Sequence, residues 1–300
     1  MKEFREQAAR LSTSTEDRGL TFAELGQRWF PIATANLKPS SVDRIRRCLK
    51  SLNKPFGAST LTGLTRQDCE TWAARRAKGI AASTFNQDLI VLKGVLQYAV
   101  DSGLLLDSPV RTLKRKRVVD KPILIPSESE FVTLLVILEK LDQRARNAIP
   151  LVKLLAYSGM RLGEATHIIW REVDFERNSF TVSGGEVGTK NHLVRVVPLF
   201  PTLAAFLQDL YQAQGSPDSS ERLIPIESAK KAIGTACAQA RLLHFTHHCL
   251  RHYFVSNAIE KGVDFKTIAA WIGHKDGGLL VAKTYGHLRD THSFEMAKRL

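Results

Sequence analysis

The spacing of apolar residues predicts that the first part of the chain is built only from helices. A capping-box pattern, Thr21 with Glu24, starts the first helix, and its apolar positions recur at helical steps. Three further helices are expected over residues 39–52, 66–78 and 83–102, with a break at 53–63 and a stop at Gly103. We therefore predict a polar, flexible lead-in over residues 1–19 and an all-α domain over residues 20–113.

The pattern changes in the second part, which mixes helices with short strands. Ser127 and Glu130 form another capping box, and helices fit residues 128–142, 146–158 and 162–170. Two β-branched runs, 180–182 and 194–197, flank a Gly-rich segment and predict a hairpin or small antiparallel sheet. Helices resume at 201–214, 228–241 and from 247 onward. The expected fold class is mainly α with a small antiparallel β-sheet, in an all-α N-terminal domain and a mixed α+β domain over residues 127–300.

A basic stretch separates the two parts. The run consists of Lys114, Arg115, Lys116 and Arg117, and prolines follow at 122 and 126. This composition predicts a linker over residues 114–126. Its charges are explained equally well by contact with phosphates and by simple solvation.

Charge and cysteine usage narrow the function classes. The net charge is +13, and residues 1–120 hold 21 Lys and Arg against 12 Asp and Glu. This balance favours a polyanionic partner, although it also suits a cytosolic protein kept soluble by its charge. The four cysteines are too scattered for a zinc site and are expected to be free and buried. No apolar run is long enough to span a membrane, and no signal peptide is evident.

Five separated side chains carry candidate chemistry. Arg161 and Arg251 can clamp one phosphate, His248 and His274 can move or donate a proton, and the Tyr285 phenol can attack phosphorus. His248 and Arg251 share a helix face. His274 follows a helix end, where the dipole favours a protonated imidazole. Each of these histidines taken alone is more typical of a polar helix surface than of an active site.

Four motifs together carry a family resemblance. They are Tyr157-Ser-Gly-Met-Arg-Leu-Gly-Glu164, His248-Cys-Leu-Arg-His252, Ile272-Gly-His274 and Tyr285-Gly-His287. In identity, order and spacing the chain resembles the tyrosine recombinase (phage integrase) family, most of all its phage-type and genomic-island integrases. The resemblance covers residues 20–290. It implies a site-specific DNA recombinase that integrates or excises a mobile element, such as a viral genome, in the bacterial cytoplasm or nucleoid.

The resemblance also implies roles for single residues. Tyr285 is the nucleophile that forms a 3′-phosphotyrosine, and Arg161, Arg251 and His274 hold the phosphate. His248 accepts the tyrosine proton or donates to the phosphate, and Glu164 orients Arg161 or a neighbour. Lys190 matches the hairpin lysine that protonates the leaving 5′-oxygen, with Arg195 and Lys230 as rivals nearby in sequence. No cofactor or metal is implied, because cations on the phosphate oxygens supply the main catalytic effect.

Several alternatives stay open at this point. The interval from His274 to Tyr285 is two residues longer than in the shorter Xer-type pattern, but the rival Tyr253 is better explained by packing. The N-terminal part is shorter than expected for the separate arm-binding domain of many phage integrases, which either a shortened chain or a simpler enzyme would explain. The resemblance implies a homo-tetramer on double-stranded attachment sites, with accessory DNA-bending proteins. The apolar side of tail 286–300 could dock on its own subunit or on a neighbour. A type IB topoisomerase-like enzyme and a non-catalytic DNA-binding protein are the alternative functions.

Overall fold

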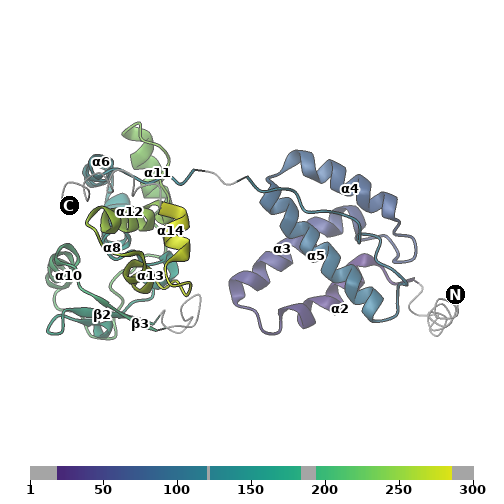
Figure 1. Ribbon diagram of the computed structural model, residues 1–300, viewed down its shortest axis with the longest axis horizontal. Coiled ribbons are helices and arrows are strands. Elements are labelled where there is room, and N and C mark those ends of the chain that lie inside the picture. The colour runs from purple at the N-terminus through teal and green to yellow at the C-terminus, as the bar shows by residue number, and fades with distance from the viewer. Residues whose placement is uncertain (1–18, 120–121, 184–193, 286–300) are drawn as a thin grey trace, which may run out of the picture. The chain divides into compact units, whose positions relative to one another are not determined.

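The computed structural model describes residues 19–119, 122–183 and 194–285, and the chain divides into two compact units between Lys121 and Pro122 (Figure 1). Residues 1–18, Lys190 and the tail 286–300 lie outside the described residues. The predicted fold class is confirmed, because the first unit is all-helical and the second adds a three-stranded antiparallel sheet. No helix in the described ranges is long and apolar enough to cross a membrane.

The N-terminal unit consists of four helices. They are α2 (Phe22–Thr34), α3 (Pro39–Phe56), α4 (Arg66–Gly79) and α5 (Ala82–Asp101). Capping boxes at Thr21 and Thr65 start α2 and α4. The expected break at residue 53 is wrong, since α3 continues through Pro55 to Phe56. Proline removes one backbone donor, but the Gly57 amide still bonds to the Asn53 carbonyl, and burial of Phe56 holds the last turn.

The second unit contains nine helices among its described residues, plus one short 3₁₀ segment. The helices are α6 (Glu128–Lys140), α7 (Gln143–Arg146), α8 (Ile149–Ser158), α9 (Leu162–Ala165), α10 (Pro201–Ala213), α11 (Lys230–Gln239), α12 (His247–Glu260), α13 (Phe265–Ile272) and α14 (Leu279–Tyr285). In Figure 1, α12 lies among α8, α13 and α14. Its buried positions divide between two clusters: Leu250 and Tyr253 belong to the cluster that includes α8, and Val255 and Ile259 belong to the cluster that includes α13 and α14.

The predicted helix over residues 162–170 is much shorter in the structure. Helix α9 ends at Ala165, and Trp170–Glu172 form the 3₁₀ helix η2. Between them the backbone pairs with a distant segment: the Trp170 amide bonds to the Glu221 carbonyl, and the Leu223 amide bonds to the Ile168 carbonyl. These long-range hydrogen bonds replace the helical ones. Sequence periodicity cannot predict them, because the partner residues are far apart in the chain.

The sheet explains how one arginine turns inward. Its strands are β1 (Val173–Asp174), β2 (Ser179–Val182) and β3 (Arg195–Pro198), in the order β1-β2-β3. Val197 pairs with Phe180, and both are buried. Because side chains alternate along a strand, Arg195 lies on the same face as Val197 and points into the domain.

Candidate active site

A pocket of about 650 Å³ brings together five of the described candidate residues of the second unit. It is lined by Arg161, His248, Arg251, His274 and Tyr285, together with His252. These side chains come from the start of α9, from α12, from the end of α13 and from α14. Residues separated by more than 120 positions therefore share one cavity.

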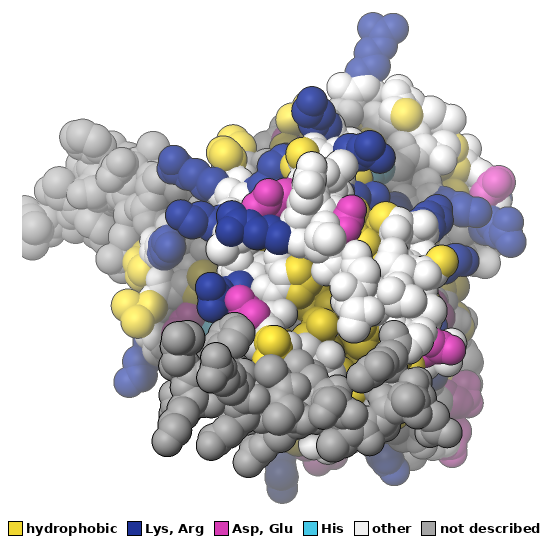
Figure 2. Space-filling view, turned by 90° about the vertical axis from the view of Figure 1, so that its right-hand side faces the viewer, with side chains coloured by type: hydrophobic (Ala, Val, Ile, Leu, Met, Phe, Trp, Pro, Cys, Tyr) yellow, Lys and Arg dark blue, Asp and Glu magenta, His cyan; other side chains and the backbone are white. Residues whose placement is uncertain are grey.

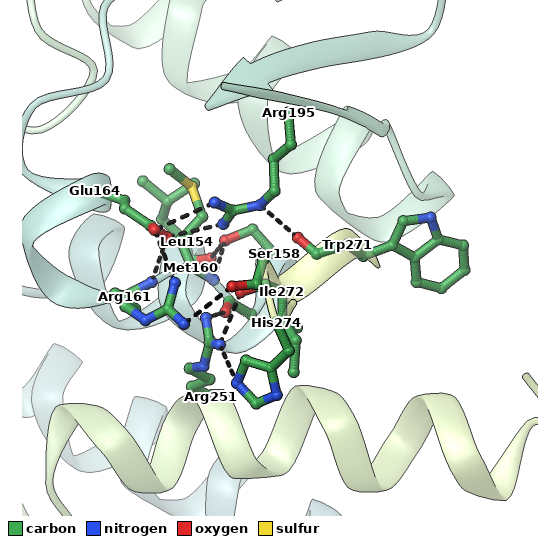
Figure 3. A network of polar contacts seen from close by, with 12 residues as sticks. Leu154, Ser158, Met160, Arg161, Glu164, Arg195, Arg251, Trp271, Ile272 and His274 are labelled. Carbon is green, nitrogen blue, oxygen red and sulfur yellow. Dashed lines mark hydrogen bonds and ion pairs between the residues drawn. The ribbon is translucent and has the colours of Figure 1, made fainter. Parts of the chain in front are cut away.

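Arg251 is the buried centre of this pocket, with only 4% of its surface exposed. Its Nη1 donates to the Gly159 carbonyl at 2.6 Å, and its Nη2 donates to the Ile272 carbonyl at 2.8 Å. The same Nη2 lies 3.2 Å from Nε2 of His274 (Figure 3). The guanidinium thus joins the ends of α8 and α13, where unpaired carbonyls are available.

Two glycines make this arrangement possible. Gly159 ends α8 with φ +64°, and Gly273 ends α13 with φ +70°, both left-handed conformations that favour glycine. After Gly159 the chain turns so that Arg161 begins α9. The motif Ser158–Glu164 is therefore a helix-to-helix turn that presents Arg161 to the pocket.

Glu164 is the anion that holds two arginines together. Its Oε1 accepts from Arg161 Nη1 at 3.1 Å, and its Oε2 accepts from Arg195 Nη2 at 2.8 Å (Figure 3). Burial acts to raise the Glu164 pKa, but the hydrogen bond and charge of Arg195, aided by Arg161, outweigh it, so the pKa lies below its usual value. The carboxylate stays ionised and fixes both guanidiniums.

Arg195 was not predicted as a site residue, only as a rival of Lys190. Its Nε donates to the Trp271 carbonyl at 2.7 Å, so it joins β3 to both Glu164 and the end of α13. The strand alternation at 194–197 was the available signal, because it places Arg195 on the face of the buried Val197. The partner across 31 residues could not be identified from that pattern.

The expected protonated imidazole at His274 is wrong for this pocket. Burial, followed by the charges of Arg251 and Arg161, lowers the His274 pKa to about 4. These effects outweigh the helix dipole, which contributes about 1 kcal/mol. Since Arg251 donates to Nε2, a neutral His274 carries its proton on Nδ1, which is buried and finds no hydrogen-bond partner among the described residues.

The hydroxyl of Tyr285 is hydrogen-bonded to Nδ1 of His252. Tyr285 is 4% exposed, and burial raises its pKa despite the nearby charge of Arg251. Burial lowers the His252 pKa to about 4, and the charges of His248 and Arg251 act in the same direction. Sequence reasoning gave His252 no role, although its position four residues after His248 places both on one helix face.

The remaining candidates have separate outcomes. Tyr253 stacks on Phe131 with ring centroids 4.7 Å apart and is buried, which confirms its packing role. In the basic run, Lys116 is held on the N-terminal unit, where its ammonium donates to the Ala77 carbonyl at 2.6 Å.

The four cysteines are free and buried, as expected. Within the described ranges, no cluster of His, Cys, Asp and Glu could hold a metal ion.

The N-terminal unit has a basic pocket of its own, of about 850 Å³, between α3 and α4. Its charged lining comprises Arg47, Lys50, Lys54, Arg75 and Arg76, with Asp68 as the acidic member. The space-filling view likewise shows many more Lys and Arg than Asp and Glu side chains (Figure 2). The local excess of positive charge matches the +9 of residues 1–120.

Two family models match the chain. The Phage integrase family model covers residues 127–292, and the model "Phage integrase, N-terminal SAM-like domain" covers residues 32–103. A "Tyrosine recombinase" of Thermosipho africanus is 22% identical over 285 residues, covering 89% of this chain and 96% of the relative. Tyrosine recombinase XerC of Chlamydia caviae is 24% identical, covering 79% of this chain and 78% of the relative.

Solved structures share the fold at low sequence identity. The Tn1549 transposon integrase, solved in complex with transposon right end DNA, has a TM-score of 0.72 at 18% identity and covers 94% of this chain and 99% of its own. A lambda integrase tetramer bound to a Holliday junction has a TM-score of 0.73 at 15% identity, and the match covers 91% of this chain and 82% of the lambda integrase chain. The Phage integrase family model alone matches more than half of the length of this chain. The chain therefore belongs to the phage integrase family and is a tyrosine recombinase, an enzyme that breaks and rejoins DNA.

Proposed function

We propose that this recombinase cuts double-stranded attachment sites through a 3′-phosphotyrosine at Tyr285 and thereby integrates or excises a mobile element. The observation that carries the proposal is one pocket that holds the Tyr285 phenol beside two guanidiniums, Arg161 and Arg251. A phosphodiester bound there would meet preorganised positive charge on its non-bridging oxygens. Such electrostatic stabilisation is usually the largest catalytic contribution.

The burial and contacts of each pocket residue indicate its role in phosphate binding or proton transfer. Arg251, buried and held by two backbone carbonyls, keeps a fixed direction, while Arg161 is held by Glu164 and by the Gly273 carbonyl. His274 also contributes to phosphate binding, because an anion in the pocket would supply the acceptor that its Nδ1 lacks. His248, exposed and on the same face of α12 as Arg251, donates to the phosphate from the solvent side. Lys190 protonates the leaving 5′-oxygen.

The burial of Arg251 supports the proposal that this pocket binds an anion. Its pKa is lowered to about 9, first by burial and then by the charge of Arg161. Two guanidiniums in one pocket repel each other, and a phosphate between them removes that repulsion. Binding of the phosphodiester therefore stabilises the charged form of Arg251.

The N-terminal unit supplies sequence-independent affinity in this proposal. Arg47, Lys50, Lys54 and Arg75 line its basic pocket and would contact backbone phosphates, as would Lys114, Arg115 and Arg117. The ammonium of Lys116 is already engaged with Ala77. Each lost phosphate contact lowers the slope of log K against log salt by about 0.9. We further propose a tetramer on two duplexes, with accessory DNA-bending proteins at the site.

The test uses a nicked suicide duplex carrying the attachment sequence that flanks the encoding element. Wild type is expected to form a covalent protein–DNA adduct on a denaturing gel, with chelator present and without ATP. Tyr285→Phe keeps the buried ring and removes only the hydroxyl, so it should bind the duplex and form no adduct. An adduct that persists in this variant would place the nucleophile elsewhere.

Two other results would redirect the proposal. Binding without an adduct in wild type would favour a non-catalytic DNA-binding protein. Relaxation of supercoiled plasmid with no site requirement would favour a type IB topoisomerase-like enzyme.

A further inference from the structure

His252 is the side chain that touches the reacting atom of the proposed nucleophile. Its Nδ1 and the Tyr285 hydroxyl are hydrogen-bonded, and the two rings lie 5.5 Å apart between centroids. The contact joins α12 to α14 across 33 residues. A general base must lie within hydrogen-bond reach of the proton it removes, and His252 meets this condition in the DNA-free pocket.

His248 and His252 lie in different surroundings, although they are one helical turn apart. Their rings meet edge to face with centroids 4.4 Å apart. His248 is exposed, whereas His252 is only partly exposed and lies against the buried Tyr285. The outer imidazole is thus suited to a phosphate oxygen, and the inner one to the phenol.

We propose that His252 is a catalytic residue: its Nδ1 accepts the Tyr285 hydroxyl proton during strand cleavage and returns it during ligation. This inference rests on the proposed phosphotyrosine chemistry. In cleavage the Tyr285 O–H bond breaks as the bond from its oxygen to phosphorus forms. The bond from phosphorus to the 5′-oxygen breaks, and that oxygen takes a proton from the general acid assigned to Lys190. Ligation reverses each transfer, so protons and charge balance over the cycle.

The charges around His252 explain why the base acts only with DNA bound. The charged and titratable groups facing it are His248 and Arg251 on α12 and Tyr285 on α14, and the shared pocket adds Arg161, His274, Lys275 and Asp276. Burial and the positive neighbours hold the pKa of His252 at about 4, so Nδ1 is unprotonated and able to accept. A phosphodiester anion on Arg251 offsets that positive charge and raises the basicity of His252. Without it, the phenol keeps its proton and the nucleophile stays unreactive.

The first experiment measures single-turnover adduct formation on the suicide duplex. His252→Asn keeps an amide oxygen near the Nδ1 position, so it can accept a hydrogen bond but takes no proton near neutral pH. We expect cleavage and ligation rates to fall by about 10²-fold or more, the usual contribution of a general base. His244→Asn, which changes an exposed histidine outside this pocket, serves as the matched control and should leave both rates unchanged.

Two altered reactants separate base catalysis from a merely structural contact. A fluorinated tyrosine at position 285 has a more acidic phenol, so it should restore much of the rate lost in His252→Asn. A substrate with a 5′-bridging sulfur has a leaving group that needs no proton. It should rescue Lys190→Ala and leave the His252→Asn defect in place. If the role of His252 were purely structural, fluorinated tyrosine would not rescue His252→Asn, and the sulfur substrate would not distinguish this variant from Lys190→Ala.

The outcomes distinguish a failure of the proposed function from a failure of the His252 role. If wild type forms no adduct, the proposed function fails. If wild type reacts and His252→Asn reacts equally fast or faster, the His252 role is overturned, and a faster rate would mean that the hydrogen bond restrains the nucleophile. If fluorinated tyrosine gives no rescue of a slow but folded His252→Asn, the base assignment is also overturned.

Discussion

Arg195 and Glu164 form a two-point ion pair, with Nη2 to Oε2 at 2.8 Å and Nη1 to Oε1 at 3.2 Å. The pair is almost inaccessible to solvent, with side-chain exposures of 11% and 3%. It connects strand β3, at the end of the segment that carries Lys190, to the turn that presents Arg161. Through the Trp271 carbonyl, Arg195 also reaches the helix end that precedes His274.

The first prediction concerns stability without this arginine. Arg195→Met leaves Glu164 buried with only Arg161 to balance it, and breaking a buried pair from one side costs about 3 kcal/mol. We expect a loss of that size in urea unfolding. Arg177→Met disrupts the solvent-exposed pair with Asp174 and should change stability by less than about 1 kcal/mol. Equal losses in both variants would contradict the importance of the Glu164 network.

The second prediction concerns pH. The Glu164 pKa is lowered in the folded protein, so its ionisation contributes stability that is fully present above the ordinary value of 4.5. That contribution is lost as pH falls through the lower folded pKa. The difference in unfolding free energy between wild type and Glu164→Gln should therefore be constant near neutral pH and shift against wild type below about pH 4.5. A pH-independent difference would mean that folding does not lower the Glu164 pKa.

The third prediction tests the turn after α8. Gly159→Ala combines a left-handed φ of +64° with a Cβ that would overlap the Phe254 ring, and it displaces the carbonyl that binds Arg251. We expect a loss of about 3 kcal/mol and no adduct formation. Gly103→Ala has a similar φ of +72° but meets nothing within 4 Å, so it should lose only about 1 kcal/mol. Thermal unfolding of the two variants side by side measures the difference.

The fourth prediction concerns Arg251, whose two terminal nitrogens reach Gly159, Ile272 and His274. A single lysine ammonium cannot span these partners and also clamp a phosphate. Arg251→Lys should reduce single-turnover cleavage by about 10²-fold or more while the variant still binds the duplex. Arg222→Lys, in an exposed pair with Glu227, is the control that should cleave normally. Normal cleavage by Arg251→Lys would contradict the clamp.

Much of the local structure was predictable from short-range patterns. The capping boxes at Thr21 and Ser127 and the glycine stops at Gly103 and Gly273 act within a few residues, so they appear directly in the sequence. Predictions were wrong where the backbone forms hydrogen bonds with a segment that is distant in sequence. Helix α9 ends at Ala165 because the following segment bonds to residues 221–223, which no local periodicity reports.

The sequence by itself determined the family, the order of the helices and the residues with suitable chemistry, because motifs and periodicity are local properties of the chain. Only the tertiary structure decided which of these groups touch. It placed His252 rather than an assigned residue on the Tyr285 hydroxyl, and it paired Arg195 with Glu164 across the domain. It also made His274 neutral, since burial and the charges of Arg251 and Arg161 depend on neighbours far apart in sequence. Hydrogen-bond partners and pKa values are set by distances in space, which the order of residues does not contain.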